Sequence, residues 1–96
     1  MIKVNKRGDK ITIKGHSLPH VCAATSSVMY TSVNALLKYD KQSILFHDGQ
    51  DDALVPNDDV EIKVLKHDKI IDMLVRNMIR MFKDIEEDYP DCISVK

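Results

Sequence analysis

Three side chains capable of nucleophilic or acid–base chemistry, His16, His20 and Cys22, lie within a segment of seven residues. A cysteine thiolate is a strong nucleophile, and a neighbouring imidazole can accept and return its proton. Such a pair can act on an acyl group through a covalent acyl-enzyme intermediate. The three side chains could instead bind a metal ion, but they lack a fourth protein ligand and fit no closed zinc spacing well. We therefore expect no metal and no cofactor.

The elements that flank this segment would hold its side chains together. A strand is expected to end just before His16, and Cys22 falls in the first turn of the next predicted helix. A helix N-terminus carries partial positive charge and unpaired N–H groups, which stabilise a thiolate and could hold an oxyanion. The alternative is that Cys22 is a small residue that only packs in the core.

Alternation of apolar and polar residues predicts five strands. They cover residues 2–5, 10–14, 43–47, 58–66 and 93–95. Arg7, Gly8 and Asp9 form a turn signal that joins the first two strands as a hairpin. The acidic connection of residues 48–57 is expected to be a mobile loop. It is not a calcium-binding EF-hand, because Ala53 and Asp59 stand where that loop requires Gly and Glu.

Helical spacing of apolar residues predicts two helices. The first covers residues 20–39, and its expected buried face is Val21, Ala24, Val28, Ala35 and Leu36. The second begins after Asp68 as N-cap and ends near Asp88, before Pro90. Its expected buried stripe is Ile71, Leu74, Val75, Met78, Phe82 and Ile85.

The order of elements is therefore β-β-α-β-β-α-β. This order predicts an α+β fold with a mostly antiparallel sheet and two helices packed on one face. With 96 residues, of which 44% are apolar and 30% charged, the chain is expected to form a single globular domain over residues 1–96.

Charge and hydropathy restrict the partners. The net charge is −1, which argues against direct nucleic-acid binding, and no apolar run is long enough to cross a membrane. The charged N-terminus has no signal-peptide core, so we expect a cytoplasmic protein with Cys22 and Cys92 reduced. Apolar residues Ile70, Met73 and Met81 widen the second helix beyond its stripe and predict a homodimer through that helix.

The residues around Cys22 also resemble a known signature. Gly15-His16-Ser17 followed by Val21-Cys22-Ala23-Ala24-Thr25-Ser26 is similar to the motif of the ribosomal-processing cysteine proteases, the Prp family. In that family a strand ends in Gly-His, and after a loop a helix opens with a Cys-Ala-Ala-x-Ser-like segment. The N-terminal hairpin, the length and the order of elements resemble the family over the whole chain.

The resemblance implies a function and a set of site residues. It implies that His16 is the catalytic histidine and Cys22 the nucleophile, with Gly15 and Ser26 as further motif positions. The substrate would be the N-terminal extension of the twenty-seventh large-subunit ribosomal protein, or a phage capsid or scaffold protein. The resemblance also implies a dimer. The substrate loop would consist of Ser17, Leu18, Pro19 and His20.

The loop departs from the family pattern. Many members have a longer, glycine-containing loop, and some have Asp three residues before the cysteine, where this chain has Pro19. His20 is then the local candidate to orient His16. The alternative function is a non-catalytic dimeric binding or scaffolding protein that keeps the protease fold.

Overall fold

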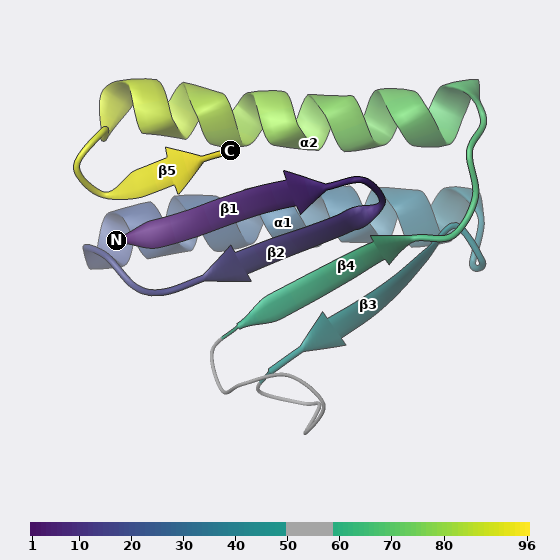
Figure 1. Ribbon diagram of the computed structural model, residues 1–96, viewed down its shortest axis with the longest axis horizontal. Coiled ribbons are helices and arrows are strands. Elements are labelled where there is room, and N and C mark those ends of the chain that lie inside the picture. Colours follow the sequence, from purple (N-terminus) through teal and green to yellow (C-terminus); the bar gives the residue numbers. More distant parts are fainter. Residues whose placement is uncertain (50–58) are drawn as a thin grey trace.

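The computed structural model describes residues 1–49 and 59–96, so most of the predicted acidic connection lies outside the described residues. Five strands and two helices follow one another in the predicted order, and their ends differ from the predicted ones by at most two residues (Figure 1). The elements are β1 (Ile2–Arg7), β2 (Lys10–Lys14), α1 (Pro19–Tyr39), β3 (Ile44–Asp48), β4 (Val60–Val64), α2 (Lys69–Asp88) and β5 (Ile93–Val95).

The strands form one mixed sheet in the order β3-β4-β2-β1-β5. Three of the four neighbouring pairs are antiparallel, and β1 with β5 is parallel because α2 returns the chain to the same end of the sheet. The β1–β2 hairpin turns at Gly8 and Asp9, where Gly8 has a φ of 58° that glycine adopts without steric cost. The predicted mostly antiparallel sheet is thus confirmed.

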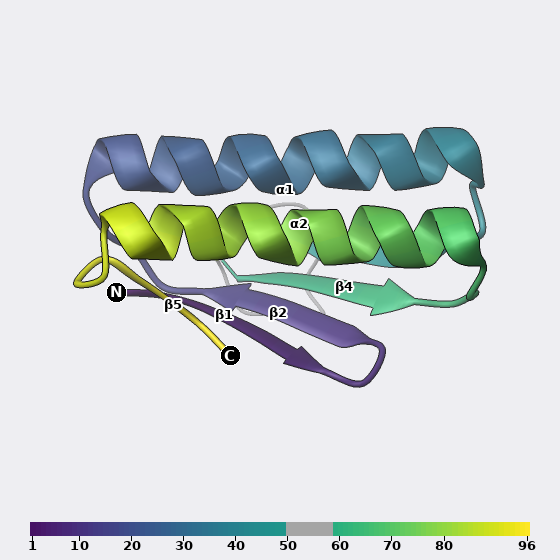
Figure 2. The same cartoon turned by 90° about the horizontal axis from the view of Figure 1, so that it is seen from above.

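Both helices lie side by side on the same face of the sheet, as Figure 2 shows. Their apolar faces and the inward residues of the strands form one core. Among residues 1–49 and 59–96, no helix lies on the opposite face of the sheet (Figure 1). This two-layer arrangement confirms the predicted α+β architecture.

The buried face of α1 differs from the predicted one. The residues that are buried are Val21, Thr25, Met29, Ser32, Val33 and Leu36. Ala24, Val28 and Ala35 are half-buried, and Val28 packs against the core. The prediction was therefore right for Val21 and Leu36, right in part for Val28, and it missed the other four buried residues. Polar Thr25 can be buried because its hydroxyl donates to the Val21 carbonyl at 2.8 Å. The spacing of apolar residues cannot predict the burial of a polar residue whose hydroxyl is hydrogen-bonded within its own helix.

Helix α2 follows the prediction closely. The Asp68 carboxylate accepts the Ile71 N–H at 2.8 Å and caps the helix, which ends at Asp88. Its fully buried residues are Ile71, Val75, Met78 and Phe82, with Leu74 and Ile85 half-buried. In the described part of the chain, neither helix is apolar enough over a sufficient length to cross a membrane.

Candidate active site

The segment between β2 and α1 changes direction at Gly15. Its φ is +90°, a conformation that side chains with a Cβ rarely adopt. A Cβ at this position would lie 2.3 Å from the carbonyl oxygen of Met1. The chain can therefore pass the N-terminus and turn toward the helix only with glycine here, and this turn places His16 beyond the carboxyl end of the central strand β2.

Helix α1 begins without a capping side chain. Its N-cap is Leu18, and Pro19 occupies the first turn, where a missing N–H costs nothing. The N–H groups of Val21 and Cys22 both donate to the Leu18 carbonyl at 3.0 Å. These two donors are therefore already used, and the first turn has fewer N–H groups for an oxyanion than the sequence suggests.

Cys22 is the fourth residue of α1 and is half-buried. The backbone N–H of Ser17 donates to its Sγ at 3.3 Å, and Sγ also lies 3.5 Å from the Ser17 carbonyl oxygen. Cys22 and Cys92 are both free cysteines. The Ser17 backbone therefore contacts the Cys22 sulfur with both its N–H and its carbonyl oxygen.

His16 and Cys22 line the same cavity, which has a volume of about 230 Å³. The two other motif positions, Gly15 and Ser26, lie in the same wall. The remaining lining residues are Ile2, Ile13, Thr25, Met29, Tyr30, Asp48 and Val60. The structure thus brings the nucleophile candidate, the histidine and a mixed apolar and polar wall into one concave site.

The predicted substrate loop is only partly at this cavity. Ser17 contacts the Cys22 sulfur through its backbone. Leu18 is 51% exposed, and the His20 ring packs edge-on against the Tyr89 ring with centroids 5.3 Å apart. Within the described residues, Leu18, Pro19 and His20 do not line the cavity. The structure therefore directs His20 toward Tyr89, at the end of α2.

Two polar residues of the cavity wall were missed by the sequence reasoning. The Tyr30 hydroxyl donates to the carboxylate of Asp48, which is only 8% exposed. The Tyr30 ring also packs edge-on against Phe46 of β3, with centroids 6.1 Å apart. Tyr30 follows Cys22 by eight residues, about two helical turns, so helical spacing could have revealed it. Asp48 could not be found in this way, because its position depends on the order of the strands.

The chain is similar to a known protein family and to several solved structures. The family model described as cysteine protease Prp matches residues 1–94. The structure of the ribosomal processing protease Prp from S. aureus with a covalently linked product peptide is 19% identical, with a TM-score of 0.80, covering 99% of this chain and 95% of that one. The protein SMU.848 from Streptococcus mutans is 18% identical, with a TM-score of 0.77, covering 99% and 90%. No curated protein matches the sequence.

These likenesses support two statements. At such low identity, the solved structures show that the fold is shared. Because the family model spans nearly the whole chain, the family itself is also shown. The protein belongs to the Prp family of cysteine proteases.

Proposed function

We propose that the chain is an endopeptidase in which Cys22 is the nucleophile and His16 the general acid and base, with residues 1–96 forming one protease domain. One observation carries this proposal: His16, beyond the end of β2, and Cys22, in the first turn of α1, line the same cavity. A peptide bond in that cavity would lie within reach of both side chains.

The reaction would proceed in two steps. The Cys22 thiolate attacks the scissile carbonyl carbon, and the His16 imidazolium gives its proton to the departing amine. A water molecule then attacks the thioester while His16 takes a proton from it. The carboxylic acid product leaves, and the thiolate is regenerated. The Ser17 N–H, which donates to the sulfur at 3.3 Å, would turn from the sulfur to stabilise the oxyanion of each step.

The proposed substrate is the N-terminal extension of the twenty-seventh large-subunit ribosomal protein or of a phage capsid or scaffold protein. Family membership supports it, as does the S. aureus protease, whose structures hold a substrate or product peptide. The apolar part of the cavity wall, which includes Ile2, Ile13 and Met29, suits an apolar side chain of such a peptide. Ribosomal proteins are assembled in the cytoplasm, so the same proposal places the enzyme there.

The test uses the two cysteines as a matched pair. Cys22→Ala and Cys22→Ser should each abolish cleavage of the precursor ribosomal protein or of a phage precursor, followed by mass spectrometry. Cys92→Ala should leave cleavage unchanged, because Cys92 is also half-buried and free but does not line the cavity. Cleavage retained by either Cys22 variant would overturn the nucleophile assignment. Failure of the parent on both precursor classes would overturn the proposed substrates.

A homodimer through α2 belongs to the same proposal. Ile70 and Met73 are 40% and 51% exposed on this helix, and Met81 is half-buried. Exposed apolar side chains so close together favour association, and a two-fold symmetric dimer is its commonest form.

Sedimentation should give about twice the chain mass, and Met73→Glu or Met81→Glu should shift the protein toward monomer. Lys83→Glu is the control, because Lys83 lines a groove with Lys6 and Arg76 that does not include Met73. A parent protein that stays monomeric at high concentration would contradict the dimer.

A further inference from the structure

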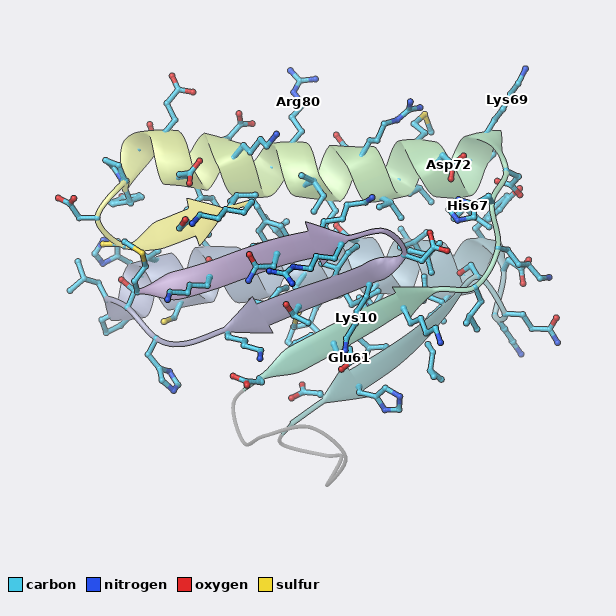
Figure 3. All side chains as sticks on the ribbon, viewed as in Figure 1. Lys10, Glu61, His67, Lys69, Asp72 and Arg80 are labelled. Atoms are coloured by element: carbon cyan, nitrogen blue, oxygen red, sulfur yellow. The ribbon has the colours of Figure 1, made fainter. Side chains whose placement is uncertain are left out.

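The sheet face that carries no helix is strongly basic. Strand residues alternate between the two faces, and the buried Ile2, Val4, Ile11 and Ile13 mark the helix side. Five cations therefore point to the open side: Lys3, Arg7, Lys10, Lys14 and Lys63. Within the five strands, the one carboxylate on this face is Glu61, which lies beside Lys10 in Figure 3. We call these five cations the basic sheet face.

The strand register brings the cations directly opposite one another. Lys3 pairs with Lys14 and Arg7 with Lys10 across β1 and β2, and Lys10 pairs with Lys63 across β2 and β4. Like charges in directly opposed positions destabilise a sheet. The Lys10–Glu61 ion pair at 3.6 Å compensates only part of this repulsion. An anionic partner would relieve the rest.

The shape and side-chain types of the face narrow the partner. Asn5, Arg7, Lys10, Thr12 and Lys14 line one shallow depression of about 300 Å³. Lysine, arginine, asparagine and threonine are the side chains that contact nucleic-acid phosphates. Lys10 and Lys14 are four residues apart on β2, so the Arg7–Lys10 pair and the Lys3–Lys14 pair are separated by about 13 Å along the strand. Cations that far apart can contact different phosphates of one nucleic-acid strand.

We propose that the basic sheet face binds the phosphate backbone of RNA. The choice of RNA, rather than another polyphosphate, rests on the proposed function, because a ribosomal protein substrate is assembled with RNA. Within the five strands, no Phe, Tyr or Trp points to the open side, where the nearest aromatic ring is that of His47, opposite Glu61. Binding would therefore follow the backbone through phosphates more than it would read bases by stacking.

Other occupants fit this face less well. A symmetric contact with a second copy would place the same cations against one another, which costs energy. A protein partner would be expected to need an apolar, charge-poor centre, whereas the centre of this face is Lys10, Thr12 and Glu61. An anionic membrane would favour apolar side chains inserted among the cations. The exposed Leu45 lies opposite Lys63 and Leu65 follows β4, whereas the depression around Lys10 and Lys14 is lined by polar and charged residues alone.

The net charge of the whole chain does not reveal the local excess of positive charge on this face. The whole chain has a charge of −1, and this value led us to expect no direct nucleic-acid binding. Acidic residues concentrate elsewhere, including Asp84, Glu86, Glu87 and Asp88 at the end of α2. A local basic surface can bind a polyanion although the total charge is slightly negative.

The experiment compares two variants that each lose four positive charges. The first is Lys3→Gln, Arg7→Gln, Lys10→Gln and Lys14→Gln on the basic sheet face. The control is Lys69→Gln, Arg76→Gln, Arg80→Gln and Lys83→Gln on α2. Figure 3 shows Lys69 and Arg80 pointing away from the sheet. Binding of a fluorescent single-stranded RNA is measured by anisotropy over a range of salt concentrations.

We expect the parent and the α2 variant to bind RNA with similar affinity. The sheet-face variant should bind at least about tenfold more weakly, and its log–log salt slope should be smaller in magnitude by about 3, since each phosphate contact on single strands contributes about 0.7. It should still cleave a short peptide at the parental rate, because the four residues do not line the cavity around Cys22.

Several results would overturn the inference. They are equal weakening by the two variants, no RNA binding by the parent, or charge-dependent binding to phosphatidylserine vesicles but not to RNA. Each of these leaves the peptide assay unaffected. Conversely, loss of the proposed protease function would appear as failure of the parent to cleave peptides, whatever the RNA result.

Discussion

Helices α1 and α2 each begin after a four-residue connection from a strand, but their first turns are stabilised differently. Residues 65–68 lead into α2 with several polar contacts. The Asp68 carboxylate accepts from the Ile71 N–H, the Tyr39 hydroxyl donates to Asp68 at 2.9 Å, and Asp72 adds a second carboxylate to the first turn. These negative groups compensate the positive end of the helix.

Residues 15–18 lead into α1 with none of these features. Leu18 provides no side-chain cap, and the first turn contains no acidic residue. Cys22 is then the group in that turn that can become negative. An ordinary N-cap would stabilise this helix, and its absence leaves the helix dipole available to a thiolate. The first turn of α2 is thus stabilised by carboxylates, whereas the first turn of α1 is left without a cap and holds the proposed nucleophile.

The largest expected effect is on catalysis, and it should distinguish His16, before α1, from His67, before α2. His16→Ala should lower kcat/KM for peptide cleavage by about 10²–10⁴-fold, the usual value of general acid–base catalysis. His67→Ala should leave kcat/KM unchanged, because His67 contacts Asp9 and Asp72 at the other connection. Steady-state kinetics with a peptide substrate measures both.

His20→Ala is the second control for this assignment. It should have a much smaller effect than His16→Ala, because the His20 ring packs on Tyr89. If His20→Ala has the larger effect, His20 is the catalytic partner of Cys22 and the assignment of His16 is wrong.

The second effect concerns the glycine that opens the α1 connection. Gly15→Ala should destabilise the protein by at least about 2 kcal/mol, because a positive φ and a backbone clash combine. The added Cβ would lie 2.3 Å from the Met1 carbonyl oxygen. Gly8→Ala is the matched control: its φ is also positive, but the space around it is open. Urea unfolding should show a clearly larger loss for Gly15→Ala, and equal losses would contradict the clash.

The sequence alone was sufficient for the order of elements, the position of each strand and the Asp68 cap. These features depend on local periods and on capping chemistry, which are visible in a single segment. The pairing of His16 with Cys22 in one site could also be predicted, because a short connection keeps both at the same end of the sheet.

The rest depends on contacts between distant segments. The Tyr30–Asp48 hydrogen bond needs β3 to lie at one edge of the sheet beside α1, which no local pattern specifies. The cation pairs of the basic sheet face need the register of β1, β2 and β4. The buried face of α1 was misjudged because Thr25 is polar yet buried, with its hydroxyl bonded within the helix.

A smaller effect, on thermal stability, should follow from removing the N-cap of α2 or from adding one to α1. Asp68→Ala should lower the melting temperature by roughly 4–8 °C, because one N-cap hydrogen bond is lost. Leu18→Asp should raise it by a smaller amount, since it gives α1 the cap it lacks. The new carboxylate should also slow alkylation of Cys22 by iodoacetamide, because a nearby negative charge disfavours the thiolate. Leu18→Ser is the control that adds a cap without charge, and it should slow alkylation less.

The smallest expected effect is a pH-dependent one at the α2 connection. The imidazole of His67 lies between two carboxylates, with Nδ1 2.8 Å from Asp72 and Nε2 2.8 Å from Asp9. Hydrogen bonds to Asp72 and then to Asp9 raise the pKa of His67 above its ordinary value. Desolvation of the ring opposes this rise of the pKa in part. Lys6 and Arg76 line the same hollow as His67.

Because the pKa of His67 is higher in the folded state, its contribution to stability is complete below its unfolded pKa of about 6.5. The contribution disappears as the pH rises through the raised folded-state pKa. His67 is exposed, so the effect should be small and should weaken further in high salt. Melting temperatures of the parent and of His67→Gln, measured between about pH 6 and pH 9, isolate it from the other histidines. The parent should lose its advantage over the variant as the pH rises, and a constant difference would show that the two carboxylates do not hold a protonated His67.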